Sequence, residues 1–175
     1  MAGAPSGATP FAVLFPGQGA QRAGMGKAVA EAYPEARACF AEADAVLGFP
    51  LSRLCFEGPQ AALDETRHAQ PALYVCASAV LRVLAARGDP LSGAAAASGL
   101  SLGEYTALHF AGAFSFADGL RLVAARGAAM QEACARRRGT MASVIGLGEE
   151  AAARALAGTG VAVTNVNAPD QVVVG

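Results

Sequence analysis

The sequence of 175 residues contains no tryptophan, and aromatic residues make up only 6% of it. It also lacks an excess of charge of either sign, since 13 Lys and Arg residues are balanced by 14 Asp and Glu residues, for a formal net charge of -1. A nucleic-acid-binding domain normally carries a strongly basic face. Here the densest basic stretch is the short run Arg136 to Arg138. We therefore do not expect nucleic acid as a partner.

Long apolar runs and a signal peptide are missing as well. Hydrophobic residues make up 54% of the chain, but many are alanine. No run approaches the roughly 18 consecutive apolar residues of a membrane-spanning helix. The first ten residues, MAGAPSGATP, have neither the basic nor the apolar region of a signal peptide, so residues 1–10 are expected to be a flexible leader. We expect a soluble cytoplasmic protein that has no membrane partner.

The cysteines show no spacing typical of a metal site or a redox pair. Cys39, Cys55, Cys76 and Cys134 form no Cys-x-x-Cys pair and no Cys/His cluster. Unpaired cysteines usually behave as small apolar side chains. The sequence therefore predicts no metal site.

Apolar patterns in the first part of the chain predict an α/β core. The run FAVLF (Phe11 to Phe15) ends at Pro16-Gly17, which is typical of a buried parallel strand that enters a tight loop. A second strand is expected at residues 94–98 (AAAAS), from its context more than from its propensity. Helices are expected over about residues 24–47 with a break at Tyr33-Pro34, over 70–87 with Pro71 at the first helical position, over 104–110 and over 116–137.

The pattern changes after Gly139. The segments TMASVIG, EEAAARALAG, VAVTNV and QVVV follow one another and predict a strand, a helix and two more strands. A small second subdomain is therefore expected to begin near Gly139.

The segment Gly99 to Gly103 (GLSLG) has the Gly-x-Ser-x-Gly pattern between an expected strand and an expected helix. Glycines on both sides of a serine permit a sharp strand-to-helix turn that exposes the hydroxyl of Ser101 as a nucleophile. The next backbone N–H, that of Leu102, would lie at a helix N-terminus and could stabilise an oxyanion. The same residues could also form an ordinary Gly-Ser turn before a helix.

A second glycine-rich loop, PGQGAQ, follows the first strand. Gly17 and Gly19 flank Gln18, so a ligand can closely approach its backbone N–H. Loops after parallel strands gather at one edge of the sheet, which places this loop near Ser101. Gln18 and Leu102 are the candidate pair of oxyanion donors, although an ordinary Pro-Gly turn would have the same sequence.

Six motifs occur in order along the chain: FPGQGAQ, QPAL, GLSLGEYTAL, the segment around Arg126, MASVIGL and NAPDQVVV. In this order and spacing the chain resembles the malonyl-CoA:acyl-carrier-protein transacylases of fatty-acid synthesis and the acyltransferase domains of polyketide synthases. The resemblance extends from about Phe11 to Gly175 and is more specific than any single motif.

The resemblance implies a role for each matching residue. Ser101 matches the nucleophile that takes the acyl group from CoA and passes it to the phosphopantetheine thiol of an acyl carrier protein. Gln18 and Leu102 match the backbone oxyanion donors. Arg126 matches the arginine that binds the free carboxylate of malonate, a role that suits a permanently charged, bidentate guanidinium. No cofactor is implied, because malonyl-CoA is the substrate.

The resemblance also implies the fold. We expect an α/β, hydrolase-like core with a short parallel sheet over residues 11–138. Residues 139–175 are expected to begin a small ferredoxin-like subdomain, which is incomplete in this chain.

Two departures from the family pattern concern catalysis. Leu100 stands where the family usually has a histidine, and leucine forms no hydrogen bond. The family's catalytic histidine lies farther along the chain than Gly175. His109 is about 12 Å from Ser101 along one helix and thus out of reach, whereas the sequence does not place His68. We therefore expect the chain to be the N-terminal part of a longer enzyme.

Two alternative functions remain open at this point. A serine thioesterase or esterase would use the same acyl-enzyme and release it with water. A catalytically silent domain would only bind CoA or a carrier protein.

Overall fold

The structure is a computed structural model that describes residues 9–136 and 139–175. The chain divides into two compact units, Met1–Glu132 and Ala133–Gly175. The expected boundary after residue 138 falls on residues 137 and 138, and most of the expected leader falls on residues 1–8. Both segments lie outside the described residues.

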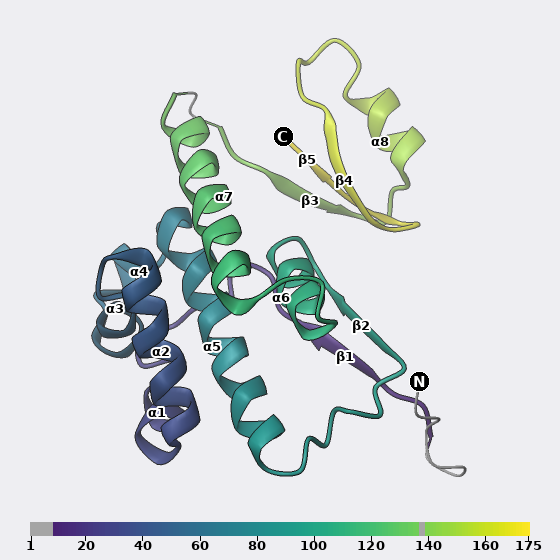
Figure 1. The fold of residues 1–175 in the computed structure, drawn as a ribbon. Helices are drawn as coiled ribbons and strands as arrows, with labels where there is room; N and C mark the ends of the chain where they lie inside the picture. Colours follow the sequence, from purple (N-terminus) through teal and green to yellow (C-terminus); the bar gives the residue numbers. More distant parts are fainter. Residues whose placement is uncertain (1–8, 137–138) are drawn as a thin grey trace. The chain divides into compact units, whose positions relative to one another are not determined.

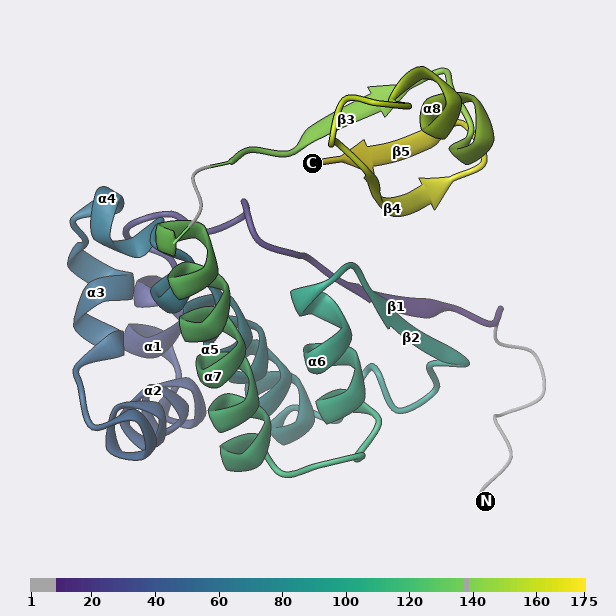
Figure 2. The ribbon, with the colours of Figure 1, turned by 90° about the horizontal axis from the view of Figure 1, so that it is seen from above.

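The first unit combines a short parallel sheet with a layer of helices (Figure 1). Strands β1 (Ala12–Phe15) and β2 (Ala96–Gly99) pair in parallel, with Phe15 opposite Gly99. The helices are α1 (Lys27–Ala32), α2 (Pro34–Leu47), α3 (Leu51–Glu57), α4 (Gln60–Leu63), α5 (Thr66–Ala86), α6 (Leu102–Phe110) and α7 (Phe116–Arg136), whose residues after Glu132 belong to the second unit. Helix α6 lies along both strands, as Figure 2 shows from a second direction.

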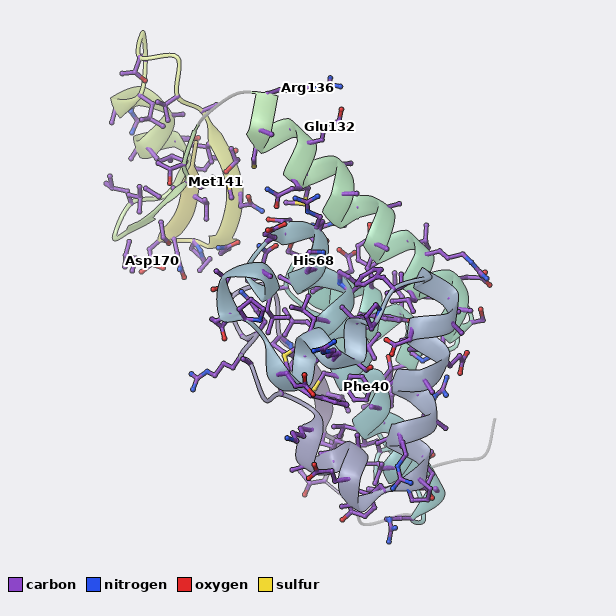
Figure 3. All side chains as sticks on the ribbon, turned by 90° about the vertical axis from the view of Figure 1, so that its left-hand side faces the viewer. Phe40, His68, Glu132, Arg136, Met141 and Asp170 are labelled. Carbon is purple, nitrogen blue, oxygen red and sulfur yellow. The ribbon has the colours of Figure 1, made fainter. Side chains whose placement is uncertain are left out.

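Helix α5 forms the centre of the first unit. Tyr74 on α5 and Phe40 on α2 are buried, and Phe40 packs edge-on against Phe56. Figure 3 labels Phe40 among the side chains of this unit. By length and composition α5 could cross a bilayer, but 56% of its apolar stretch is buried inside the protein. More than half of this stretch therefore packs against the rest of the protein.

Helix α5 begins earlier than the sequence predicts. It starts at Thr66 and not at Gln70, so Pro71 lies inside the helix and His68 is helical. Hydrogen bonds at its N-terminus hold this first turn: the Thr66 N–H donates to Oε1 of the distant Gln131 at 2.9 Å, and the carbonyl of Glu65, the residue just before the helix, accepts from the amides that follow. These contacts offset the hydrogen bond that Pro71 cannot make.

Other boundaries differ by smaller amounts. Strand β2 begins two residues later and ends one residue later than expected, and α6 begins at Leu102, directly after Ser101. Helices α3 and α4 were not predicted. Each follows a proline, Pro50 or Pro59, and is too short to show a helical period in the sequence.

The second unit contains the four predicted elements in order: β3 (Ala142–Ile145), α8 (Glu149–Ala155), β4 (Val163–Ala168) and β5 (Gln171–Val174). The strands form an antiparallel sheet in the order β3-β5-β4. Val172 on β5 is fully buried and packs in one cluster with Ala152 of α8. This β-α-β-β order matches the first four elements of the ferredoxin-like β-α-β-β-α-β motif. The predicted fold class, α/β with a short parallel sheet and a small additional sheet, is confirmed.

Candidate active site

Ser101 occupies a strained turn between β2 and α6. Its backbone has φ 53° and ψ -104°, a conformation that residues other than glycine rarely adopt. A Cβ on Gly99 would collide with the Gly103 carbonyl, and a Cβ on Gly103 would collide with the Phe15 carbonyl oxygen. Both glycines are therefore required for the close approach of helix and strands, and Ser101 remains exposed at the turn.

The loop after β1 lies against this turn. Because Phe15 pairs with Gly99, both strands end at the same edge of the sheet. A Cβ added to Gly17 would lie 2.8 Å from the Leu100 carbonyl oxygen, so the two loops are in contact. Within the described residues, neither the Gln18 N–H nor the Leu102 N–H donates to a protein acceptor. The two candidate oxyanion donors thus come from adjacent loops, with Leu102 at the N-terminus of α6.

Arg126 reaches the serine from α7. Its Nη2 donates to Ser101 Oγ at 2.8 Å, and its Nη1 donates to Gln70 Oε1 at 2.7 Å. The guanidinium carbon lies 5.7 Å from the centre of the Tyr105 ring. A nucleophile candidate and a permanent positive charge are therefore in direct contact, although 25 residues separate them in the sequence.

A close approach of α7 to α5 accounts for the position of Arg126. The next residue, Gly127, is buried, and a Cβ there would lie 2.8 Å from the Thr66 carbonyl oxygen. One turn later, Gln131 accepts a hydrogen bond from the Thr66 N–H. The close approach of α7 to α5 at Gly127 therefore places the Arg126 guanidinium near the N-terminal end of α5, where Gln70 lies.

Gln70 is a site residue that sequence reasoning missed. It is fully buried, and its Nε2 donates to Gln18 Oε1 at 3.3 Å and to Met130 Sδ at 3.2 Å. The Gln18 side chain in turn donates to Thr66 Oγ1 at 3.2 Å. The available signal was a lone uncharged polar residue at the start of the apolar QPAL segment.

Leu100 is 61% exposed beside the serine. It presents an apolar surface at the entrance to the site and no hydrogen-bonding group.

Neither histidine contacts Ser101. The Nδ1 of His68, which Figure 3 labels, lies 2.8 Å from the Ala62 carbonyl oxygen, and its ring packs against Phe49. The Nδ1 of His109 lies 3.3 Å from the Phe114 carbonyl oxygen, and its ring packs against Tyr74. Burial raises the pKa of Tyr74 well above its usual range, so this environment is apolar. Both imidazoles have structural partners away from the serine.

An apolar cavity of about 410 Å³ lies between β1 and α5. It is lined by strand residues such as Val13 and helix residues such as Val80, but not by Ser101.

Across residues 9–136 and 139–175, no group of three His, Cys, Asp or Glu side chains is placed to hold a metal ion.

Comparison with known families decides the assignment. The model of the acyl transferase domain matches residues 13–175. The chain belongs to this family. The resemblance drawn from the ordered motifs is therefore confirmed.

Curated relatives include malonyl transacylases. The malonyl CoA-acyl carrier protein transacylase of Escherichia coli is 44% identical over 170 residues, which cover 95% of this chain and 54% of that protein. The polyketide biosynthesis protein ThaF of Burkholderia thailandensis is 45% identical over 181 residues, which cover 99% of this chain and 15% of the relative. The chain therefore spans about half the length of the Escherichia coli transacylase and a much smaller part of ThaF.

Solved structures of the family share the fold. An acyl carrier protein S-malonyltransferase from Vibrio cholerae matches with a TM-score of 0.82 at 42% identity, over 95% of this chain and 55% of that one. A malonyl-transacylase solved with a type II polyketide synthase acyl-carrier protein also matches with a TM-score of 0.82, at 41% identity, over 95% of this chain and 54% of that one. Both units of this chain thus lie within a known acyltransferase architecture.

Proposed function

We propose that this chain carries the acyl-binding part of a malonyl-CoA:acyl-carrier-protein transacylase. In this proposal Ser101 accepts the malonyl group as an ester and then transfers it to the phosphopantetheine thiol of a carrier protein. The supporting observation is the 2.8 Å hydrogen bond from Arg126 Nη2 to Ser101 Oγ. A positive charge in contact with the acylated atom suits an acyl group that ends in a carboxylate.

The first half-reaction follows from the loops around the serine. Ser101 Oγ attacks the thioester carbonyl carbon, and the carbonyl oxygen becomes an oxyanion that the N–H groups of Gln18 and Leu102 stabilise. The C–S bond then breaks, and CoA leaves as its thiol with the proton that a base took from the serine. Neither His68 nor His109 is placed to be that base. The resemblance assigns it to a histidine in the part of the relatives that this chain does not span.

The second half-reaction reverses these steps with a different thiol. The phosphopantetheine thiol attacks the ester carbon, the C–O bond breaks, and Ser101 recovers its proton. Arg126 binds the malonate carboxylate in both halves. Each guanidinium nitrogen Nη carries two N–H groups, so the bond to Gln70 leaves donors for the substrate.

The alternative of a thioesterase or esterase has less support. An enzyme for uncharged acyl groups needs an apolar acyl pocket, but the cavity between β1 and α5 is not lined by Ser101. The proposed partners are therefore malonyl-CoA and an acyl carrier protein, in fatty-acid or polyketide synthesis. We also propose a cytoplasmic location, although one human relative is described as mitochondrial.

Covalent loading of the serine tests the proposal. The chain is incubated with malonyl-CoA, and intact mass spectrometry measures the malonyl adduct over time. We expect slow loading, because the absence of a general base typically lowers the rate about 10²- to 10⁴-fold. The variant Ser101→Ala should form no adduct, whereas the exposed-serine control Ser92→Ala should load like the parent.

The outcomes separate the candidate functions. Persistence of the adduct in Ser101→Ala would place the nucleophile elsewhere. Complete absence of an adduct in the parent chain would favour the silent binding domain. Rapid release of the malonyl group to water without a carrier protein would favour the hydrolase.

A further inference from the structure

The side chain of Gln70 is the most completely bonded polar group in the site. Buried polar side chains are unfavourable unless each polar atom has a partner. The Gln70 Oε1 accepts from Arg126 Nη1 at 2.7 Å, and Nε2 donates to Gln18 Oε1 and to Met130 Sδ. One amide therefore joins α5, α7 and the loop after β1.

The partners also determine how the amide is oriented. A guanidinium can only donate, so the atom of Gln70 that faces Arg126 must be the oxygen. The amide nitrogen then faces the Gln18 oxygen and the Met130 sulfur, both of which can only accept in these contacts. The opposite orientation would place N–H groups of Gln70 against N–H groups of Arg126. All three contacts agree on one arrangement.

We propose that Gln70 is a positioning residue for acyl selectivity: it holds the Arg126 guanidinium against Ser101 and ties the Gln18 loop to the same amide. The effect on acyl selectivity rests on the proposed function. The positioning of Arg126 by Gln70 does not. Within the described residues, the Arg126 side chain donates hydrogen bonds to Gln70 and Ser101 only. Since Ser101 must be free to react, Gln70 is the permanent anchor.

A neutral anchor preserves the charge that the substrate needs. A Glu or Asp at this position would form a buried ion pair with Arg126 and compete with the malonate carboxylate for it. The amide oxygen of Gln70 orients Nη1 without neutralising the guanidinium, which has no carboxylate partner in the part of the chain that the structure describes. The buried position of Gln70 keeps water from replacing this hydrogen bond.

Two variants separate the hydrogen bond from the charge. Gln70→Met keeps the length and volume of the side chain but removes the acceptor. Gln70→Glu keeps an acceptor and adds a negative charge against Arg126. The control is Ser78→Ala, which alters another buried polar residue of α5 without touching Arg126.

The first measurement reports positioning without any substrate. In ¹⁵N-labelled full chain, NMR exchange measurements on the Arg126 Nη–H groups give the rate of rotation about the Nε–Cζ bond, and Arg126→Lys identifies the signals. Gln70→Met should raise this rate about tenfold or more, as expected for loss of a hydrogen bond to a charged group. Gln70→Glu should keep rotation slow, and Ser78→Ala should match the parent.

The second measurement is the ratio of malonyl to acetyl loading on Ser101. We expect this ratio to fall about tenfold in Gln70→Met and further in Gln70→Glu, because acetyl loading does not use the Arg126 charge and therefore falls less than malonyl loading. Unchanged rotation in Gln70→Met overturns the proposal, as does an equal loss of malonyl and acetyl loading in both variants. A third outcome is faster rotation in Gln70→Met with no malonyl adduct on any variant or on the parent chain. This outcome supports the positioning role of Gln70 and contradicts the proposed function.

Discussion

The positive charge of Arg126 has no carboxylate partner among the described residues, because its side-chain donors go to an amide oxygen and a hydroxyl. A partly buried guanidinium without an anionic partner is unfavourable, and an anionic substrate relieves that penalty. An acetyl group cannot do so. Discrimination between malonyl and acetyl groups should therefore depend on rejection of the uncharged group as well as attraction of the charged one.

Arg126→Ala should consequently lower malonyl loading of Ser101 about 10²-fold or more and leave acetyl loading unchanged or improved. Initial loading rates from malonyl-CoA and acetyl-CoA, followed by intact mass, measure both effects. The control is Arg121→Ala, which removes an exposed arginine from the same helix. If malonyl and acetyl groups both load equally slowly on Arg126→Ala, the arginine stabilises the fold or binds CoA. The malonyl assignment would then rest on family membership alone.

Sequence reasoning could reach the site residues that carry obvious chemistry. Ser101 stands in a recognisable glycine pattern, and Arg126 lies in a segment that matches a family motif. Gln70 was missed because an amide has no intrinsic reactivity, so its role depends on partners that the fold supplies. Those partners, Gln18 and Arg126, are 52 and 56 residues away in the sequence. Pairings over such distances leave no local pattern.

Helix α7 shows how an element can depart from residue propensities for the sake of packing. By helix propensity alone, Gly119 and Gly127 each weaken α7 by up to about 1 kcal/mol. Both glycines are buried at contacts with α5: a Cβ on Gly119 would collide with the Tyr74 hydroxyl, and one on Gly127 would press on the Thr66 carbonyl. Glycine is a weak helix former, but at these two positions it lets α7 pack closer to α5. This close packing places Arg126 at the site.

Gly127→Ala should therefore destabilise the protein although alanine is the better helix former. The added methyl group at 2.8 Å from backbone oxygen forces α7 away from α5, and overpacking of this kind costs about 1 to 3 kcal/mol. The matched control is Ala128→Gly, at the next, exposed position, which should cost about 1 kcal/mol by propensity. Urea unfolding followed by circular dichroism measures both. A more stable Gly127→Ala variant would show that α7 can shift freely.

Elements with a strong local pattern were predicted, and those that tertiary contacts define were not. The run Phe11 to Phe15 matched β1 closely, because five apolar residues before Pro-Gly are a local signal. The start of the alanine-rich β2 was predicted two residues too early, since alanine has little strand preference and the pairing of β2 with β1 sets the register. The start of α5 was missed because it depends on a hydrogen bond that the Thr66 N–H donates to Oε1 of the distant Gln131.

The core of the first unit contains many small side chains. Several alanines are fully buried, and two thiols, Cys39 and Cys55, lie among them with no exposed surface. The chain is therefore rich in hydrophobic residues although few of them are aromatic, because small apolar side chains fill much of this core. Burial raises the pKa of both thiols to about 12, because a thiolate would lose its hydration in this core. Cys134, in contrast, is exposed.

These thiols make the stability of the whole molecule sensitive to alkali. Their pKa is 9.0 without burial and about 12 in the folded chain, so above pH 9 the unfolded state releases protons that the folded state retains. The free energy of unfolding is then at its full value below pH 9 and falls as pH rises toward about 12, by at most about 1.4 kcal/mol per pH unit for each thiol.

The urea concentration at the unfolding midpoint should therefore decrease as pH is raised from about 8 to about 11, and the decrease should be smaller in Cys39→Ala. The control Cys134→Ala should keep the full decrease, since its thiol is exposed in the folded chain. An identical pH dependence in Cys39→Ala and the parent would mean that this thiol ionises as easily in the folded core as in the unfolded chain.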